Sequence, residues 1–600
     1  MGLPEYALMN GVGDNVYLIW KNGILQRINA KKITDLEKVE EINLVNSGQG
    51  VTAVQFMIGK ASLLIGDSSG DIKAWFRIRP EGYTQGDGSK LIAAHHIAST
   101  EGAVHALAAS ARSRVFAAAY ANGVVKLFNL TNELHLLDLD QSQHNIPHRL
   151  IFAPKEDGLI ALGDRGLSRW GIQLGYPEIS YTSLIRPIWY EGYSTPEHVW
   201  QSSSGDDSFE PKFGMWPLIF GTLKATFYSL IIGVPLALCA AIYTREFLHP
   251  KVRSVVKPTI EVMASLPSVV LGFLGALVIA PFIEHVISTI IIAFLLVPVC
   301  FALAGFLWHA FPQKWQRWLH GYKWIFIVLV LPVSLWLSVT ASPLIENILF
   351  DGNFKQWLQQ KDHKSASGWF VLFMPLAGIL SIFAMDTFIN PLIRQFAKRL
   401  SASREAYLNL FKFFAGVAFS CCLAWMAAQL LAFVGCDPRN SFLGVYGQRN
   451  ALVVGLMMGF AIIPIIYTLA EDALSSVPDH LRSASLGCGA TNWQTASRIV
   501  IPTAMSGIFS AIMVGLGRAV GETMIVLMSA GNTPVLDLNI FNGFRTLSAN
   551  IAVELPEAVQ GSTHYRTLFL AALALFVFTF LLNTIAESMR QRFRKRAFEL

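Results

Sequence analysis

Charged residues and cysteines are both scarce in this chain of 600 residues. Asp, Glu, Lys and Arg together make up 15% of it, and it contains 6 cysteines. No two cysteines have the C-x-x-C spacing of a zinc or redox site, and none lies before residue 205. The composition therefore argues against a disulfide framework, and the adjacent Cys421 and Cys422 are expected to be packed or lipid-facing thiols.

Several nucleotide-binding and catalytic motifs are also missing. The chain has no G-x-x-x-x-G-K-[ST] sequence, so we do not expect it to bind ATP through a P-loop. It has no H-E-x-x-H, EF-hand or serine nucleophile-elbow pattern either. We therefore expect a protein that is not an enzyme and that needs no cofactor or metal ion.

Long apolar runs are abundant instead, and hydrophobic residues reach 53%. After about residue 212 the runs approach the ~20 residues that a helix needs to cross a bilayer, where only a helix satisfies its own backbone. The expected fold class is a polytopic α-helical membrane protein with a soluble region in front. About nine transmembrane helices are predicted, at 216–242, 262–283, 286–307, 323–346, 368–388, 409–434, 450–469, 504–530 and 566–586.

Basic residues gather in the short connections between these runs. If successive helices alternate in direction, the basic groups lie on one side together with the polar loop 471–502, and the positive-inside rule makes that side cytoplasmic. The net charge of +6 thus indicates orientation in a membrane, not binding to nucleic acid. The groups are Arg245, Lys251, Arg253 and Lys257; Lys314, Arg317 and Lys323; Arg394, Lys398, Arg399 and Arg404; and Arg590, Arg592, Arg594, Lys595 and Arg596.

Nine crossings with a cytoplasmic C-terminus place residues 1–205 outside the cytoplasm, which in a bacterial inner membrane means the periplasm. Yet the residues after Met1 contain neither the basic n-region nor the apolar h-region of a signal peptide. We expect that a membrane-spanning segment is missing upstream and that the chain is N-terminally truncated. The alternative is that one predicted span is wrong and the front region is cytoplasmic.

Four segments of the front region resemble one another. Each has a polar turn at Gly23, Gly70, Gly123 or Gly166, followed by an alternating strand as in a β-hairpin. A repeat of about 43 to 53 residues is typical of propeller blades, so residues 1–205 look like a partial, divergent WD-repeat β-propeller. No chemistry is assigned to this all-β domain. Its expected blade-core residues are Trp75, Phe128 and Trp170, and its expected solvated loop pair is His95 and His96.

The loop 471–502 is polar although it joins two apolar runs, so we expect it to bind another protein. It contains Ser483-Ala484-Ser485, then Gly489, and closes with Ile499-Val500-Ile501-Pro502. This pattern resembles the coupling loop of ABC-importer permeases, which reads E-A-A, three residues, Gly, nine residues, I-x-L-P. The acidic first residue is absent here.

The resemblance implies a short helix around Ser483–Gly489 that lies along the cytoplasmic surface and inserts into a groove of the ATPase. Gly489 would permit the turn after this helix, and Pro502 would end the loop before the next span. Glu471 and Asp472 are near enough in sequence to replace the missing carboxylate. The alternative is an ordinary polar cytoplasmic loop.

Further motifs are similar to those of phosphate-specific permeases of the PstC type, in a longer form with an extra soluble domain. The likeness covers residues 214–283 and 450–600, the expected permease core, and is poor over 284–449, which looks like an insertion of four spans. The motifs are Trp216-Pro217, Gly221-Thr222-Leu223, Leu266-Pro267-Ser268, the run Gly515–Met524, Asn532-Thr533-Pro534, and the run Arg545–Asn550.

Arg518 and Glu522 are charged residues inside the predicted span 504–530. Such charges are costly in lipid and usually face a cavity or a partner. Four residues apart on a helix, they would share one face and could pair, while an arginine fork matches a tetrahedral oxyanion. The resemblance implies that Arg518, Glu522 and Thr523 line the phosphate path. The alternative is a purely structural ion pair.

The resemblance implies one half of the pore of an ATP-driven importer of inorganic phosphate. The expected partners are a second permease subunit, an ATP-binding cassette ATPase dimer, an external phosphate-binding protein and membrane lipid. Two alternatives stay open. One is a permease for another oxyanion such as sulfate or molybdate, and the other is a membrane phosphate sensor or scaffold that uses the propeller as its interaction surface.

Overall fold

The computed structural model divides the chain into two compact units. The first comprises Met1–Ile219 with Val553–Leu573, and the second comprises Phe220–Ala552 with Ala574–Leu600. The basic residues Lys314, Arg317, Arg394, Lys398 and Arg399 lie outside the described residues. The structure describes residues 2–32, 34, 36–80, 82–139, 146–204, 209–310, 323–360, 365–391, 402–440 and 442–598.

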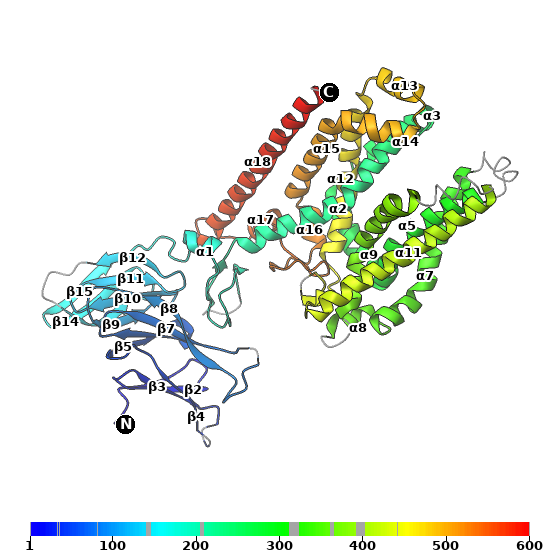
Figure 1. The fold of residues 1–600 in the computed structure, drawn as a ribbon. Coiled ribbons are helices and arrows are strands. Elements are labelled where there is room, and N and C mark those ends of the chain that lie inside the picture. Colours follow the sequence, from blue (N-terminus) through cyan, green and yellow to red (C-terminus); the bar gives the residue numbers. More distant parts are fainter. Residues whose placement is uncertain are drawn as a thin grey trace. The chain divides into compact units, whose positions relative to one another are not determined.

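The first unit is built from consecutive antiparallel sheets whose strands follow one another in chain order (Figure 1). Among the described residues of the first four sheets, three sheets have four strands and the fourth has three, as in consecutive blades of a propeller. The first blade consists of β1 (Tyr6–Met9), β2 (Asn15–Ile19), β3 (Ile24–Asn29) and β4 (Glu37–Asn43), and the second of β5 (Val51–Phe56), β6 (Ser62–Asp67), β7 (Ile72–Ile78) and β8 (Lys90–Ile97). The third consists of β9 (Val104–Ala109), β10 (Val115–Tyr120), β11 (Val125–Asn129) and β12 (Leu134–Leu139). The fourth consists of β13 (Pro147–Phe152), β14 (Gly158–Gly163) and β15 (Gly166–Gly171).

The turn glycines predicted from the repeat sit where the structure requires them. Gly23, Gly70, Gly123 and Gly166 have φ values of 92°, 102°, 86° and 136°, which L side chains rarely adopt. Each connects the second and third strands of its blade. The sequence pattern therefore identified the hairpin inside every blade.

The prediction that His95 and His96 form a solvated loop pair is wrong. Both lie on strand β8, and His95 is buried. Its ring nitrogens face a carboxylate oxygen of Glu133 at 3.1 Å and the carbonyl oxygen of Trp189 at 3.0 Å. Alternation along β8 turns one imidazole inward and the other outward, as the period of a strand dictates. Of the expected blade-core residues, Phe128 is buried, and Trp75 and Trp170 are half-buried.

A connection of little regular structure follows the blades and also belongs to the first unit. It holds α1 (Tyr181–Ile185), β16 (Trp200–Gln201) and β17 (Lys212–Phe213). The buried Trp200 indole donates to the Glu554 carboxylate at 3.1 Å, and His564 lies 2.8 Å from the same carboxylate. These contacts tie the connection to residues 553–573 within the unit.

The second unit is helical, and eight helices of the described chain are long and apolar enough to cross a membrane. The chain is a multi-pass membrane protein. The described helices from residue 216 onward include two groups. Before residue 441 they are α2 (Trp216–Glu246), α3 (Pro250–Met263), α4 (Ser268–Leu274), the π-turn η2 (Gly275–Ile279), α5 (Ala280–Ala310), α7 (Lys323–Phe350), α8 (Phe354–Gln359), α9 (Ser365–Ala384), η4 (Met385–Ile389), α11 (Ala402–Phe433) and η5 (Pro438–Asn440). After it they are α12 (Ala451–Ser475), α13 (Asp479–Gly487), α14 (Asn492–Thr495), η6 (Ala496–Val500), α15 (Ile501–Gly521), α16 (Met524–Ser529), α17 (Leu547–Glu554) and α18 (Thr563–Phe598).

One of these eight candidates, Ser268–Trp308, is too long for a single crossing. Its 41 residues would extend about 60 Å as one helix, twice a hydrocarbon core of about 30 Å. The helix breaks at Val286, whose φ of −113° and ψ of 20° are not helical. The predicted spans 262–283 and 286–307 are therefore joined without a loop.

Contacts on either side of Val286 favour a turn there. Before the break, Lys257 of α3 binds Glu471 at the end of α12, while Glu284 binds Gln448 just before α12 starts. After the break, α5 runs antiparallel to α7: Ser288 binds Glu346 near the end of α7, and Trp308 packs against Phe326 near its start. A turn at Val286 would let the long candidate cross twice, which would agree with about nine crossings.

Glycines let α12 approach both of its neighbouring helices. A Cβ on Gly455 or Gly459 would lie 3.1 Å or 3.4 Å from atoms of Tyr228 or Ile232 on α2. A Cβ on Gly515 of α15 would lie 2.5 Å from Ile466 of α12. Small residues at such crossings give membrane helices their packing contacts. Gly455 and Gly459 therefore serve the packing of α12 against α2.

Candidate functional site

The helix that carries Arg518 ends earlier than predicted. A continuous helix runs from Asn492 through η6 and α15 to Gly521, whereas the predicted span was 504–530. Glu522 follows with extended φ and ψ of −67° and 126°. Arg518 therefore lies on the helix and Glu522 beyond its end, so the two side chains do not share one helical face. These two described residues form no ion pair with each other. Their predicted pairing is wrong in this structure.

The Arg518 side chain is exposed on α15, close to the helix end. Hydrogen bonds from side-chain hydroxyls to backbone carbonyls stabilise the break that follows. Ser548 of α17 donates its hydroxyl to the Glu522 carbonyl at 3.0 Å, and Thr523 donates to the Gly521 carbonyl at 3.3 Å. The break therefore places Glu522 and Thr523 between α15, α16 and α17, one helical turn after Arg518.

A buried lysine near the start of α2 was not identified from the sequence. Lys224 has a fully buried side chain and donates to Asp537 at 2.7 Å. Asn542 donates to the other oxygen of the same carboxylate at 2.6 Å, and the ammonium lies 5.7 Å from the Phe544 ring centre. The available signal was a lysine inside an apolar run. The ion pair between Lys224 and Asp537 holds the segment 530–546 against α2.

The same segment also approaches α2 through its backbone. A Cβ on Gly221 would lie 2.1 Å from the Arg545 carbonyl oxygen, so only glycine fits there. Next to it, the Leu547 amide donates to the Thr222 hydroxyl at 3.1 Å. The glycine and threonine of the Gly221-Thr222-Leu223 motif thus contact the start of α17 and fix its position against α2. Helix α17 in turn stabilises the break through the hydrogen bond from Ser548 to the Glu522 carbonyl.

The polar loop forms a separate, exposed structure at the other end of α2 and α12. Helix α13 covers Ser483, Ala484 and Ser485 as predicted, and Gly489 follows it with φ +86°. A Cβ at Gly489 would meet nothing within 4 Å, so backbone conformation and not space requires glycine there. Pro502 does not end the loop, because the next helix already begins at Asn492. Ile499 lies in the π-turn η6 within that helix.

Arg482 joins α13 to the ends of two long helices. Its guanidinium donates to the Leu474 and Val477 carbonyls at 2.7 Å and 2.6 Å. It also binds Asp479 at 2.9 Å and Glu246 of α2 at 3.3 Å. The side chain therefore satisfies backbone carbonyl groups at the end of α12 and connects this helix to both α13 and α2.

Glu471 cannot replace the missing carboxylate of the loop. It is fully buried and binds Lys257 at 2.7 Å, Ser475 at 2.9 Å and also Arg253. Asp472 binds Lys257 at 2.7 Å but keeps 58% of its side chain exposed. Of the two carboxylates considered, only Asp472 remains accessible to a partner.

The part of the chain that the structure describes offers no metal site, since no group of three or more His, Cys, Asp or Glu side chains could hold an ion there.

Comparison with known proteins adds to this geometry. Residues 397–598 match the family model described as "Binding-protein-dependent transport system inner membrane component". The C-terminal part of the chain is similar to that permease family. The match includes α12, the exposed loop with α13, and Arg518.

Individual relatives carry names of phosphate permeases. The chain is 37% identical over 145 residues to the phosphate transport system permease protein PstC of Mesorhizobium japonicum, covering 24% of this chain and 44% of that protein. It is 34% identical over 171 residues to PstC 1 of Mycobacterium tuberculosis, covering 28% and 48%. It is 32% identical over 148 residues to PstC of Haemophilus influenzae, covering 25% and 46%. The chain thus spans about half the length of these relatives.

The front region has its own structural neighbours. The β-propeller domain of Cps50 (Swd1) from Myceliophteria thermophila aligns with a TM-score of 0.24 at 17% identity, covering 28% of this chain and 53% of that one. The WD40 domain of Sif2 aligns with a TM-score of 0.23 at 11% identity, covering 28% and 44%. The strand order within this chain is by itself that of consecutive blades.

Proposed function

We propose that this chain is a transmembrane permease subunit of an ATP-driven importer of inorganic phosphate. It would form the pore with a second, related permease and receive phosphate from an external binding protein. An ATP-binding cassette ATPase dimer would supply the energy, so the chain itself would catalyse no reaction. The names of the relatives support the cargo, and the family similarity of residues 397–598 supports the class.

The observation that carries the proposal is the position of Arg518. The residue lies inside a membrane-crossing helix, and its side chain is exposed in the single subunit. A guanidinium facing lipid would be costly, so this face of α15 should border water or a second subunit. A fork of five donors at such a border matches a tetrahedral oxyanion. Glu522 and Thr523, at the adjoining break, would shape the same path.

The exposed loop supports coupling to a separate ATPase. Ser483, Ala484 and Gly489 are exposed, and so are the large apolar side chains Leu486 and Trp493. Exposed apolar groups at a polar surface mark a protein-binding site. Movement of α13 would pass through Arg482 to α2 and α12.

We further propose the orientation in the membrane. With the loop cytoplasmic, α2 begins at the outer side, because Lys224 near its start and Glu246 at its end lie at opposite ends of the bundle. Residues 1–205 would then be periplasmic in a bacterial inner membrane, and the C-terminus would be cytoplasmic.

Phosphate uptake by permease-deficient cells tests the proposal. We expect Arg518→Gln to lower uptake at least about tenfold at matched membrane abundance, because the neutral amide cannot form charge-assisted bonds to the anion. Arg518→Lys should retain part of the uptake. The matched control is Arg112→Gln, an exposed arginine of the β unit, which should transport normally. Equal uptake by the parent and Arg518→Gln would contradict a path through Arg518.

The cargo needs a separate measurement, since no spacing in the chain encodes the anion. Uptake of labelled phosphate in the presence of excess sulfate or molybdate should remain unchanged. Strong competition by either anion would favour another oxyanion permease. Phosphate-dependent signalling that survives in Arg518→Gln would favour the sensor or scaffold.

A further inference from the structure

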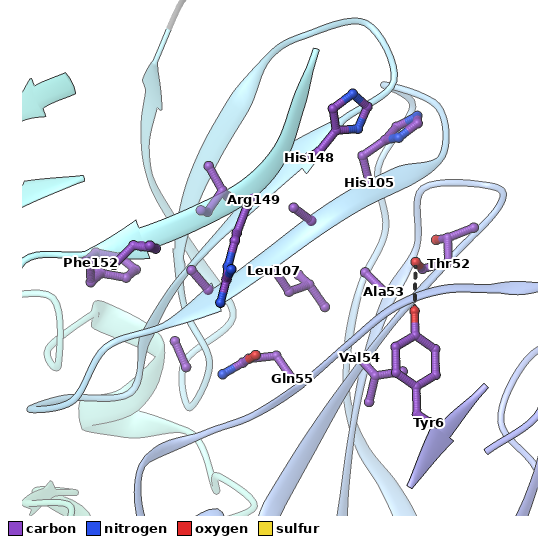
Figure 2. A pocket seen from close by; sticks show the side chains of 15 residues that line it. Tyr6, Thr52, Ala53, Val54, Gln55, His105, Leu107, His148, Arg149 and Phe152 are labelled. Atoms are coloured by element: carbon purple, nitrogen blue, oxygen red, sulfur yellow. Dashed lines mark hydrogen bonds between the residues drawn. The ribbon is translucent and has the colours of Figure 1, made fainter. Parts of the chain in front are cut away.

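A cavity in the β unit is not used by the proposed transport function. It has a volume of about 450 Å³ and is lined by β5, β9 and β13, the first strands of three successive blades, with Tyr6 of β1 at its edge. Figure 2 shows the Tyr6 hydroxyl bonded to the Thr52 carbonyl, which joins the first blade to this wall. The volume lies within the usual range for small-molecule sites, ~300–1,000 Å³.

The arginine and histidine side chains that line the cavity are basic, and no acidic side chain faces them from the described lining. His105, His148 and Arg149 all have exposed side chains, and no Asp or Glu occurs among the lining residues that the structure describes. The two imidazoles lie with ring centres 6.2 Å apart, side by side in Figure 2. Asp164, which does not line the cavity, binds His148 at 3.0 Å and orients its ring. The described lining therefore holds a fixed positive charge at Arg149 and no carboxylate, which favours a negatively charged ligand.

The rest of the wall is mixed. Leu107 and Phe152 offer apolar surface, and Gln55 adds an amide. In Figure 2 the Arg149 side chain extends past Leu107 toward Gln55, away from the imidazole pair. A cavity with apolar walls and a few directed polar groups suits a ligand that has both a carbon body and a charged group.

We propose that this cavity binds a small organic anion. Its carboxylate or phosphate group would lie at Arg149, whose planar fork can bind either group through two bonds. Imidazoles at His105 and His148 would contact a second polar group, and the carbon body would pack on Leu107 and Phe152. The inference depends only on the β unit and stands apart from the proposed transport function.

The test is calorimetric titration of the purified full-length chain in lipid nanodiscs. All variants carry Arg518→Gln, which removes the proposed phosphate path from the comparison. The probes are citrate, adenosine monophosphate and inorganic phosphate, which separate a carboxylate ligand, a phosphate ligand with an organic body, and the bare anion. We expect citrate or the nucleotide to bind and bare phosphate to bind weakly or not at all.

Arg149→Gln should then weaken binding at least about tenfold, because the charged fork is lost. His105→Ala should weaken binding as well and serves as the second variant if Arg149→Gln does not fold. The matched control is Arg169→Gln, an exposed arginine on β15 outside the cavity, which should bind like the parent. The proposal is overturned if neither organic probe binds the parent at about 10 mM, a level weaker than ordinary ligand sites. Equal weakening by Arg169→Gln, or bare phosphate binding as tightly as the organic probes, would overturn it too.

Discussion

At the scale of single residues, Glu210 shows how burial changes the chemistry of a carboxyl group. It lies in the connection between the blades and α2, where Thr131 donates a hydrogen bond to it and Arg114 lies 3.6 Å away. Burial raises the pKa of Glu210 to about 7, and the Glu191 charge adds to that effect. The charges of Arg114 and Lys212 oppose the rise without cancelling it.

A pH-dependent stability follows from this raised pKa. The ordinary pKa of a glutamate is 4.5. Between pH 4.5 and about 7, the folded state therefore keeps a proton on Glu210 that the unfolded state has lost. Stability should therefore fall as pH rises through this window. Glu210→Gln should remove that part of the slope and raise the melting temperature relative to the parent near pH 8.

Thermal unfolding of the full-length protein from about pH 5 to about pH 8 measures this difference in slope. Glu5→Gln, which changes an exposed carboxyl group of the same unit, should keep the slope of the parent. An unchanged slope in Glu210→Gln would mean that Glu210 is ionised in the folded protein.

At the scale of elements, the ends of helices carry more of the candidate function than their middles. Arg482 makes its contacts where α12 ends, and it links α13 to both α12 and α2. If α13 receives the movement of an ATPase, Arg482 is the side chain through which that movement reaches the membrane helices.

Arg482→Ala should therefore uncouple transport from ATP hydrolysis, in a complex assembled as proposed above. We expect uptake to fall about tenfold while ATPase activity of the complex is largely retained, because a charged group that makes several hydrogen bonds is lost at the joint. The measurement is phosphate uptake and ATP hydrolysis in the same proteoliposomes. Arg498→Ala, an exposed arginine in η6, is the control and should stay coupled. Parallel loss of both activities would point to failed assembly instead.

Long elements were readable from the sequence, whereas their interruptions were not. The runs of apolar residues located the crossings, and the turn glycines located the blade hairpins. The end of α15 at Gly521 was missed because it is held by tertiary contacts, such as the bond from Ser548, that no local pattern encodes. The burial of His95 was missed for the same reason, since its partners Glu133 and Trp189 are remote in sequence.

At the scale of the whole molecule, the direction of every helix after Val286 depends on the turn made there. If Ser268–Trp308 crosses twice, the β unit and the α13 loop lie on opposite sides of the membrane. If it crosses once, α8 and the α13 loop both change sides, and the α13 loop would leave the end of α2 to which Arg482 is bound through Glu246. Hydrophobicity alone does not distinguish these cases, because both halves of the segment are apolar and no polar loop separates them.

Cysteine labelling decides between the two arrangements. The native Cys488 reports the α13 loop, since it is exposed there, and Ser47→Cys and Gln359→Cys report the β unit and α8, each in a background that lacks the other cysteines. We expect an impermeant maleimide to label Ser47→Cys and Gln359→Cys in intact cells, and to label Cys488 only after the membrane is opened. This pattern follows from the antiparallel contacts of α5 with α7 and from the position of Glu284 near the start of α12. Labelling of Cys488 and Ser47→Cys from the same side, with Gln359→Cys protected, would show a single crossing and refute the turn at Val286.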